Sequence, residues 1–466
     1  MKFVSGPSLF VACLALWAAT PAAAQFLDED MEKKLHAPGP MPDRIVLTWR
    51  GDPTRSQSVT WRTDTSVAKG TAVAEVAVSE AGPKFRWKAR SVPAVTTLLK
   101  TDLSEAHYHT VDFTNLTART KYVYRVGDGT YWSEWCHFQT AAEQPEPFSF
   151  LYFGDAQLQI RSHWSRLVRE AYATAPRARF AIHAGDLINS SNRDAEWGEW
   201  CQAAGWINTT VPVVPTPGNH EYTSTDDEGN AILARHWRAQ FALPENGPSA
   251  IKEGVYYFDY QGVRIVSLDS NDKLEEQIPW LERVLSKNPN RWTILTFHHP
   301  VFVSTIRWNS DKRRQLWKPI IDKYRVDLVL QGHDHIYGRS PLIGGTVYVI
   351  SVSGPDLRWL DKTDWMKRSG EGKQLFQVIH IDGDRLRYEA RSALGELHDS
   401  FELRKQARGQ PNLLIEGKAA PDSKPPEPER SVTLLPIIVL LLLMVVLVWL
   451  RVARRRAATP LGRGSA

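Results

Sequence analysis

Residues 326–335 read VDLVLQGHDH, an apolar run of strand length that ends in a glycine and a His-Asp-His triplet. Four other apolar runs end in similar polar groups, namely Gly-Asp-Ala-Gln at 154–157, Gly-Asp at 185–186, Gly-Asn-His-Glu at 218–221 and His-His-Pro at 298–300. In α/β folds the ligand crevice lies at the carboxyl ends of the strands, and glycine lets the backbone turn sharply there. We therefore predict that these five loops converge on one site.

The sequence around these loops, from residue 148 to 404, predicts an α/β domain. Apolar strand candidates alternate with amphipathic helix candidates, a pattern typical of that fold class. The predicted strands are 148–153, 179–183, 211–215, 264–269, 292–297, 326–331 and 346–352, and the predicted helices include 163–174, 231–242, 273–286 and 311–323.

Residues 42–140 predict a separate, all-β domain in front of the α/β domain. Short segments of alternating apolar and polar residues are divided by turn residues such as Gly51-Asp52, a pattern that indicates a β-sandwich. A Gln-Pro-Glu-Pro linker at 144–147 joins the two domains. Prolines among charged residues at 405–431 predict an extended stalk after the second domain.

Both ends of the chain carry apolar segments. Residues 1–24 have the form of a signal peptide, with Lys2, an apolar run and small residues before Gln25. Residues 432–452 predict a transmembrane helix, and the arginines in 453–466 predict a basic cytoplasmic tail. Together they predict a single-pass membrane protein with its folded domains outside the cytoplasm, in the periplasm or the extracellular space. The Pro-Glu-Pro at 426–428 leaves a bacterial sorting signal as an alternative.

Composition excludes several classes of protein. Of the 466 residues, 23% are charged and 42% hydrophobic, which excludes a disordered or collagen-like chain. Residues 25–450 hold 51 basic and 52 acidic side chains, so nothing in the charge predicts a nucleic-acid partner. Beyond the signal peptide only Cys136 and Cys201 remain. They could pair in an exported chain, but two cysteines are too few for a disulfide scaffold.

The polar residues of the five loops suit a pair of metal ions. A carboxylate can bridge two ions, an imidazole nitrogen binds borderline metals, and an asparagine carbonyl is a neutral oxygen ligand. Two adjacent ions can lower the pKa of a bound water and orient a phosphate oxygen. Each loop alone is a weak signal, because Gly-Asp and Gly-Asn are common turns. Five such loops in order after apolar runs are hard to explain by turn chemistry.

The ordered set GD, GD, GNHE, H and GHDH resembles the signature of the calcineurin-like metallophosphoesterases. Residues 43–63, DRIVLTWRGDPTRSQSVTWRT, look like the N-terminal domain of purple acid phosphatases. The resemblance covers residues 42–404. It implies a fibronectin-type-III-like β-sandwich followed by an α/β/β/α sandwich that carries the metallophosphoesterase site.

The resemblance also implies a role for each loop residue. One metal ion takes Asp155, Asp186 and His335, and the other takes Asp186, Asn219, His298 and His333, so Asp186 bridges the pair. His220 is the implied catalytic residue, which hydrogen-bonds the phosphate or protonates the leaving oxygen. His299 and Tyr337 are candidates for contact with substrate.

The sequence departs from purple acid phosphatases at the position three residues after the bridging aspartate. That family has a tyrosine ligand there, whereas this chain has Asn189. Gln157 lies two residues after Asp155, where many other phosphoesterases carry a histidine ligand. Gln157 or Asn189 could complete the first site through a carbonyl oxygen. The metals are therefore left open as two divalent or trivalent ions of Fe, Mn or Zn.

The implied reaction is hydrolysis of small phosphomonoesters by a metal-bound hydroxide. The first alternative is a phosphodiesterase that acts on nucleotides or lipid head groups. The second is a catalytically inert surface binding protein, which should have lost a metal ligand. All six implied ligands are present in suitable residue types. The sequence leaves the substrate and the oligomeric state open.

Overall fold

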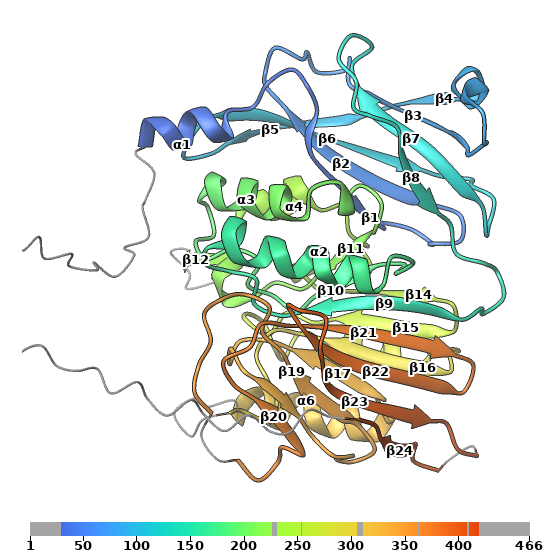
Figure 1. Ribbon diagram of the computed structural model, residues 1–466, viewed down its shortest axis with the longest axis vertical. Helices are drawn as coiled ribbons and strands as arrows, with labels where there is room; N and C mark the ends of the chain where they lie inside the picture. The colour runs from blue at the N-terminus through green and yellow to red at the C-terminus, as the bar shows by residue number, and fades with distance from the viewer. Residues whose placement is uncertain are drawn as a thin grey trace, which may run out of the picture.

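The computed structural model describes residues 29–225, 231–252, 254–304, 311–360, 363–407 and 410–418 (Figure 1). A β-sandwich stands on one side of a larger domain in which sheets are layered with helices. A short helix, α1 (Glu29–His36), precedes the sandwich.

The N-terminal domain is a sandwich of two four-stranded antiparallel sheets. The first has the order β1 (Asp43–Thr48), β2 (Gln57–Thr63), β6 (Glu105–Phe113), β5 (Val95–Lys100), and the second β4 (Arg90–Pro93), β3 (Val73–Val78), β7 (Lys121–Gly127), β8 (Cys136–Gln139). The inward side chains form one core that includes Trp61 and Phe138. The backbone N–H of Thr117 donates to the hydroxyl of Tyr122, which ties the approach to β7 onto the sheet. The finer fibronectin-type-III likeness stays a prediction.

The second domain contains two seven-stranded sheets. One has the order β11 (Val213–Pro215), β10 (Ala181–His183), β9 (Phe148–Phe153), β21 (Leu375–Asp382), β22 (Arg385–Ser392), β23 (Leu397–Arg404), β24 (Leu413–Glu416). The other has the order β14 (Tyr256–Tyr260), β15 (Val263–Ser267), β16 (Trp292–Thr296), β17 (Leu328–Gln331), β19 (Val347–Ile350), β18 (Tyr337–Arg339), β20 (Arg368–Gly370). Strands β9 to β11 are parallel to one another, as are β15, β16, β17 and β19.

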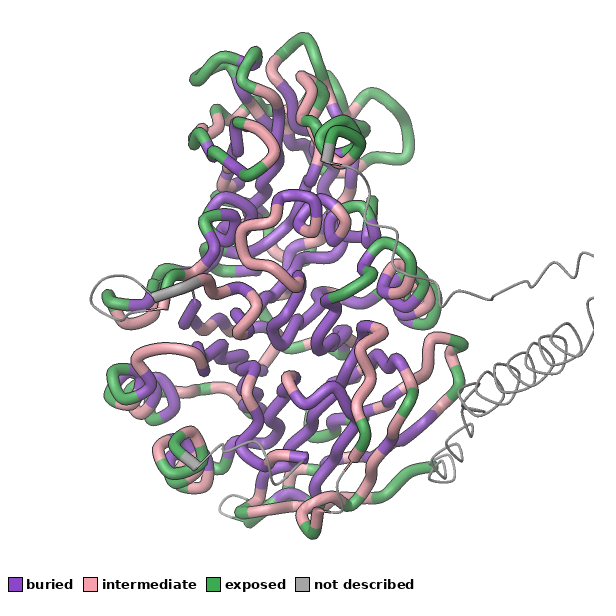
Figure 2. Tube along the Cα trace, turned by 90° about the vertical axis from the view of Figure 1, so that its left-hand side faces the viewer, coloured by how far each residue is buried: buried purple, intermediate pink, exposed green. Residues whose placement is uncertain are grey.

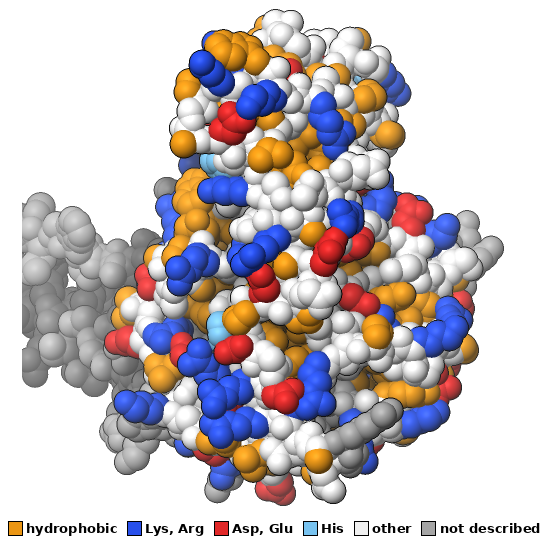
Figure 3. All heavy atoms as spheres, turned by 90° about the vertical axis from the view of Figure 1, so that its right-hand side faces the viewer, with side chains coloured by type: hydrophobic (Ala, Val, Ile, Leu, Met, Phe, Trp, Pro, Cys, Tyr) orange, Lys and Arg blue, Asp and Glu red, His pale blue; other side chains and the backbone are white. Residues whose placement is uncertain are grey.

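Helices cover the outer face of each sheet, which gives the predicted α/β/β/α layering. The core between the sheets continues into α2 (Ser165–Thr174) and α3 (Asp194–Ala204), and a second core lies under α5 (Ile278–Ser286) and α6 (Asp311–Tyr324). Figure 2 shows the molecule from another side, and there the interior is buried while the peripheral turns are exposed. Figure 3 shows another face, on which basic and acidic side chains are interspersed.

Two predicted elements differ from those observed. Residues 231–233 form a strand, β13 (Ala231–Leu233), which pairs with β12 (Tyr222–Thr225), and the helix α4 (Arg235–Gln240) is correspondingly short. Pairing with a neighbouring strand has overridden the local helical pattern here. The predicted extended stalk at 405–431 contains a strand near its start, because β24 pairs with β23. Residues 419–431 lie outside the described part of the chain.

The predicted membrane location is contradicted. Spanning a bilayer takes about 20 apolar residues, and no helix among the described residues combines that length with an apolar composition. The longest of them, α6, has 14 residues and is rich in charge. The predicted signal peptide (1–24), span (432–452) and tail (453–466) lie outside the described residues. The prediction of a single-pass protein with a cytoplasmic C-terminus and the membrane as its partner is therefore wrong for the described residues.

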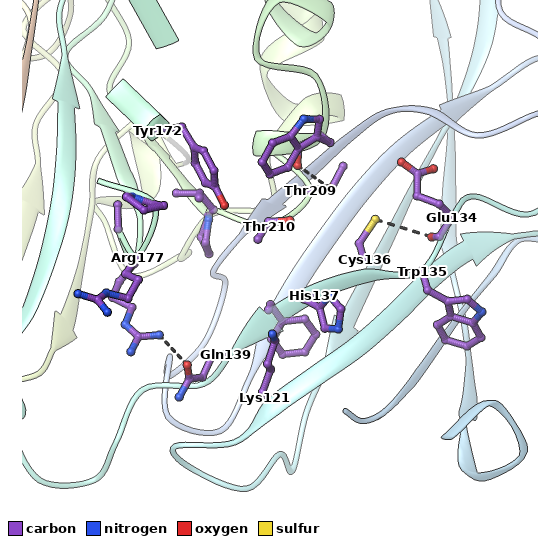
Figure 4. A pocket seen from close by; sticks show the side chains of 17 residues that line it. Lys121, Glu134, Trp135, Cys136, His137, Gln139, Tyr172, Arg177, Thr209 and Thr210 are labelled. Atoms are coloured by element: carbon purple, nitrogen blue, oxygen red, sulfur yellow. Dashed lines mark hydrogen bonds between the residues drawn. The ribbon is translucent and has the colours of Figure 1, made fainter. Parts of the chain in front are cut away.

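A groove of about 550 Å³ lies between the two domains, lined by residues 134–139 of the sandwich, by 176–179 before β10 and by 209–212 before β11 (Figure 4). The guanidinium of Arg179 donates to the side chain of Gln139 across it, at 2.7 Å. Cys136 lines this groove, and Cys201 is buried in α3. Both thiols are free, so the structure contains no disulfide between them.

A buried charge cluster joins the sandwich to the second domain. The carboxylate of Asp194, the first residue of α3, accepts hydrogen bonds from Arg44 on β1 at 2.7 and 2.9 Å. Arg62 on β2 and His236 on α4 donate to the same carboxylate at 3.3 and 3.1 Å. All four side chains are buried. A buried charge is strongly destabilising when it loses its partner. The cluster therefore favours the one docking of the two domains in which these charges stay paired.

Replacing Asp194 with asparagine should lower the free energy of unfolding by about 3 kcal/mol, because the guanidinium of Arg44 would stay buried without a carboxylate, whereas Arg62 keeps its pair with Asp43. Chemical denaturation at neutral pH measures the loss. The control is Asp112→Asn, whose partner Arg50 is 41% exposed. That change should cost about 1 kcal/mol or less, and an equal loss in both variants would contradict the role of the cluster.

The same cluster predicts a loss of stability in acid. Burial opposes ionisation of Asp194, but the hydrogen bond from His236 and the charge of Arg44 outweigh it and hold the pKa of this carboxyl well below its usual range. Its contribution to stability is therefore complete above the pKa of an unfolded aspartate, about 3.9, and is lost as the pH falls further. The difference in stability between wild type and Asp194→Asn should shrink over that range.

Candidate metal centre

Five strands of the two sheets deliver the predicted site residues to one place. Asp155 follows β9, Asp186 follows β10 and Asn219 follows β11, all in the first sheet. His298 follows β16, and His333 and His335 follow β17, in the second sheet. The site therefore lies where the carboxyl ends of strands from both sheets meet, as the rule for parallel strands requires.

The six predicted ligands lie together in two overlapping groups. Asp155, Asp186 and His335 each offer a ligand atom within 4.8 Å of the others, and so do Asp186, His298 and His333. The side-chain oxygen of Asn219 lies 3.0 Å from His298 Nε2 and 2.9 Å from His333 Nδ1. Asp186 belongs to both groups. The arrangement matches the ligand sets that the sequence predicts, and the ligand roles themselves stay predictions.

The electrostatics of the cluster favour a positive charge among these atoms. His298 Nδ1 donates to the carbonyl of Ala184 at 2.9 Å, and its Nε2 lies 3.1 Å from a carboxylate oxygen of Asp186. Burial lowers the pKa of His298, but the carboxylates of Asp186 and Asp155 outweigh burial and raise it to about 9. A bound metal ion would supply the same positive charge. The residues present therefore fit a cation.

Gln157 supplies a second sign that the cluster is built for a ligand. Its amide nitrogen lies 3.3 Å from His335 Nε2. Its amide oxygen is buried and has no hydrogen-bond partner among the described residues. A buried unpaired carbonyl oxygen is costly, and a metal ion held by Asp155 and His335 would satisfy it.

The backbone of the ligand loops is strained. Asp155, Asp186, His333 and His335 have φ angles of 43°, 51°, 75° and 56°, in the left-handed region. Such residues cost about 1–3 kcal/mol each and cluster at functional sites. Glycine is needed beside them: a Cβ on Gly218 would lie only 2.1 Å from an oxygen of Asp186.

Two carboxylates that the sequence analysis did not assign hold the ligands in place. Glu221 is fully buried and accepts the backbone N–H groups of Gly218, Asp186 and Leu187 at 2.6, 2.8 and 2.7 Å. His335 Nδ1 lies 2.7 Å from the carboxylate of Asp356. Asp356 follows β19 at the same edge of the sheet, in a Gly-Pro-Asp turn, which is the signal that could have revealed it.

His220 stands at the open side of the cluster. Its backbone N–H donates to Asp186 at 2.9 Å, and its side chain is 30% exposed. Its Nδ1 donates to the carbonyl of Asn189 at 2.6 Å, which leaves Nε2 to face the site at 3.9 Å from Asp186. The N–H groups of Asn189 and Ser190 in turn donate to Glu196 on α3, both at 2.7 Å.

Of the two candidates for contact with substrate, His299 lies beside the cluster and Tyr337 does not. His299 lies beside the cluster, with its ring 4.2 Å from that of His333 and its Nδ1 2.9 Å from the hydroxyl of Ser270. Tyr337 is buried on β18, where its hydroxyl donates to Asp399 at 2.8 Å. The structure therefore does not bring Tyr337 to the metal cluster, because β18 carries its side chain into the core.

Family models match two parts of the chain. Residues 42–140 match the purple acid phosphatase N-terminal domain, and residues 117–337 match the calcineurin-like phosphoesterases. An uncharacterised protein of Mycobacterium tuberculosis (strain H37Rv) is 30% identical over 289 residues, which cover 52% of each chain. A purple acid phosphatase of Glycine max is 26% identical over 261 residues, 53% of this chain and 56% of the relative.

A solved structure shares the fold. A purple acid phosphatase from yellow lupin seeds superposes with a TM-score of 0.68 at 18% identity, over 84% of this chain and 78% of that chain. The chain spans about half the length of the curated relatives that it matches.

Proposed function

Because this chain is a purple acid phosphatase-like member of the calcineurin-like metallophosphoesterase superfamily, we propose that it is a metal-dependent hydrolase of phosphomonoesters. The observation that carries the proposal is the pair of ligand groups that share Asp186. The inert alternative is disfavoured, since all six ligand side chains are present and converge.

We assign the ligands as two sites. Asp155, Asp186 and His335 would hold one ion, with the unpaired oxygen of Gln157 as a further ligand. Asp186, His298, His333 and Asn219 would hold the other. When bound, such a pair supplies a water of lowered pKa and positive charge for the phosphate oxygens.

The protein's own residues position the substrate and move a proton. His220 Nδ1 is held by the carbonyl of Asn189, so Nε2 is the atom that faces the substrate. In its protonated form Nε2 can donate to the leaving oxygen. Glu196 fixes the 189–190 loop and therefore the orientation of the imidazole.

Asn189 affects which oxidation state of metal ion the centre would favour. Its backbone carbonyl accepts from His220, and its backbone N–H donates to Glu196. Its side-chain amide cannot supply the negative charge of a tyrosine phenolate. Since a neutral position stabilises ferric iron less than a phenolate does, we propose divalent ions at both sites.

Removing the metals should abolish hydrolysis. Protein treated with a chelator and dialysed should hydrolyse p-nitrophenyl phosphate at less than about a thousandth of the initial rate, because the attacking water and the phosphate lose their activating charge. Addition of Mn, Zn or ferrous iron should restore the rate, with two ions bound per chain by elemental analysis. Full activity in the metal-free protein would refute the proposal.

A further inference from the structure

A wide, shallow cavity of about 570 Å³ lies beside His220 and is open to solvent. It is lined by residues 189–193 after β10, by residues in 219–223 after β11, and by Asp102 from the turn between β5 and β6 of the sandwich. Both domains therefore contribute to a space that touches the metal ligand Asn219 and the proposed proton donor.

The position of the cavity indicates which part of a substrate it would hold. Hydrolysis forms a bond between phosphorus and a water oxygen and breaks the bond to the alcohol oxygen of the ester. The water loses a proton to solvent, and the alcohol oxygen gains one from His220. The leaving alcohol must therefore lie next to His220, and His220 is one of the residues that line the cavity.

The lining is rich in hydroxyl and amide groups. Residues 189–192 contribute two serines and two asparagines, and Thr223 contributes another hydroxyl. Asn192 accepts from the backbone of Arg235 through its oxygen, at 3.3 Å, so its amide donors are directed elsewhere. Tyr222, the aromatic residue of this lining, donates its hydroxyl to the buried Asp269.

The two charged side chains of the lining, Arg193 and Asp102, already have partners within the protein. Arg193 pairs with Glu32 and lies 3.7 Å from Glu196, so its charge is largely balanced. Asp102 accepts from the backbone N–H of Asp194 at 2.9 Å through one oxygen. Its other oxygen can accept from a hydroxyl of a ligand.

We propose that this cavity receives a polyhydroxylated leaving group, so that phosphate esters of sugars and polyols are the preferred substrates. The inference rests on the proposed phosphatase function and narrows its substrate class. Hydroxyl and amide side chains pair with such a group, whereas a hydroxyl-free group offers them no partner. The sandwich takes part in this selection through Asp102.

The test compares two substrates of similar size. Glucose 6-phosphate carries hydroxyls, and cyclohexylmethyl phosphate has a six-membered ring without them. With the metal-loaded full chain, kcat/KM should be about tenfold or more higher for the sugar ester, because one hydrogen bond to a substrate hydroxyl contributes up to about tenfold and the sugar offers several hydroxyls. In Thr223→Val and Asp102→Asn the ratio of the two values should fall by about threefold or more. Thr174→Val, an exposed position on α2, should leave the ratio unchanged.

The outcomes separate this inference from the proposed function. Equal or faster hydrolysis of the hydroxyl-free ester overturns the sugar and polyol class, while turnover of p-nitrophenyl phosphate in the same preparation keeps the phosphatase proposal standing. A ratio that the two cavity variants do not change overturns the assignment of this cavity. If the protein with both metals bound hydrolyses none of the phosphoesters, the phosphatase proposal is overturned and the inference with it.

Discussion

Replacing Asp186 with asparagine should lower kcat/KM by about a thousandfold or more and remove at least one metal ion per chain. Asp186 is the residue common to both ligand groups, and it lies 3.1 Å from His298. An amide has only one oxygen and no negative charge, so it cannot bridge two cations as a carboxylate does. Elemental analysis of the purified variant gives the metal content, and p-nitrophenyl phosphate gives the rate.

The matched control for this variant is Asp334→Asn. Asp334 lies between His333 and His335, and it is equally buried, but its carboxylate accepts the backbone N–H of Ser304 instead of facing the ligand groups. This change should leave two metals bound. If Asp186→Asn retained both metals and the wild-type rate, the assignment of the bridge would be wrong.

Replacing His220 with alanine should leave both metals bound and lower kcat by about a hundredfold to ten-thousandfold, the usual contribution of a general acid. The contact of His220 with Asp186 at 2.9 Å is made by the backbone and persists in alanine. The loss should be larger for glucose 6-phosphate than for p-nitrophenyl phosphate, because nitrophenolate leaves readily without a proton and a sugar alkoxide does not.

The control for His220 is His163→Ala. His163 lies in the turn before α2, where its ring contacts the hydroxyl of Ser162. Its removal should change neither kcat nor metal content. Loss of a metal ion in His220→Ala would show that His220 is a ligand, and equal losses for the two substrates would argue against its role as proton donor.

Much of the site could be predicted from sequence because its chemistry is local to each loop. A glycine and a polar residue directly after an apolar strand identify both the turn and the ligand, as at Gly154-Asp155 and Gly185-Asp186. The order of the domains follows in the same way from a change in the spacing of apolar residues. The prediction of a helix at 231–242 was wrong at its first residues. Residues 231–233 form a strand there because they pair with β12, and the local sequence does not show that partner.

The sequence by itself determined the residue types of the centre, the two-domain order and the α/β class, since each depends on short-range patterns. Only the tertiary structure decided which ligands form groups, that Asp356 holds His335, and that Asp102 of the sandwich reaches the cavity beside His220. It also decided the docking of the domains through Arg44 and Asp194, which lie 150 residues apart. Contacts of this kind arise only when separate loops and domains have packed, because no local pattern encodes the partner of a buried charge.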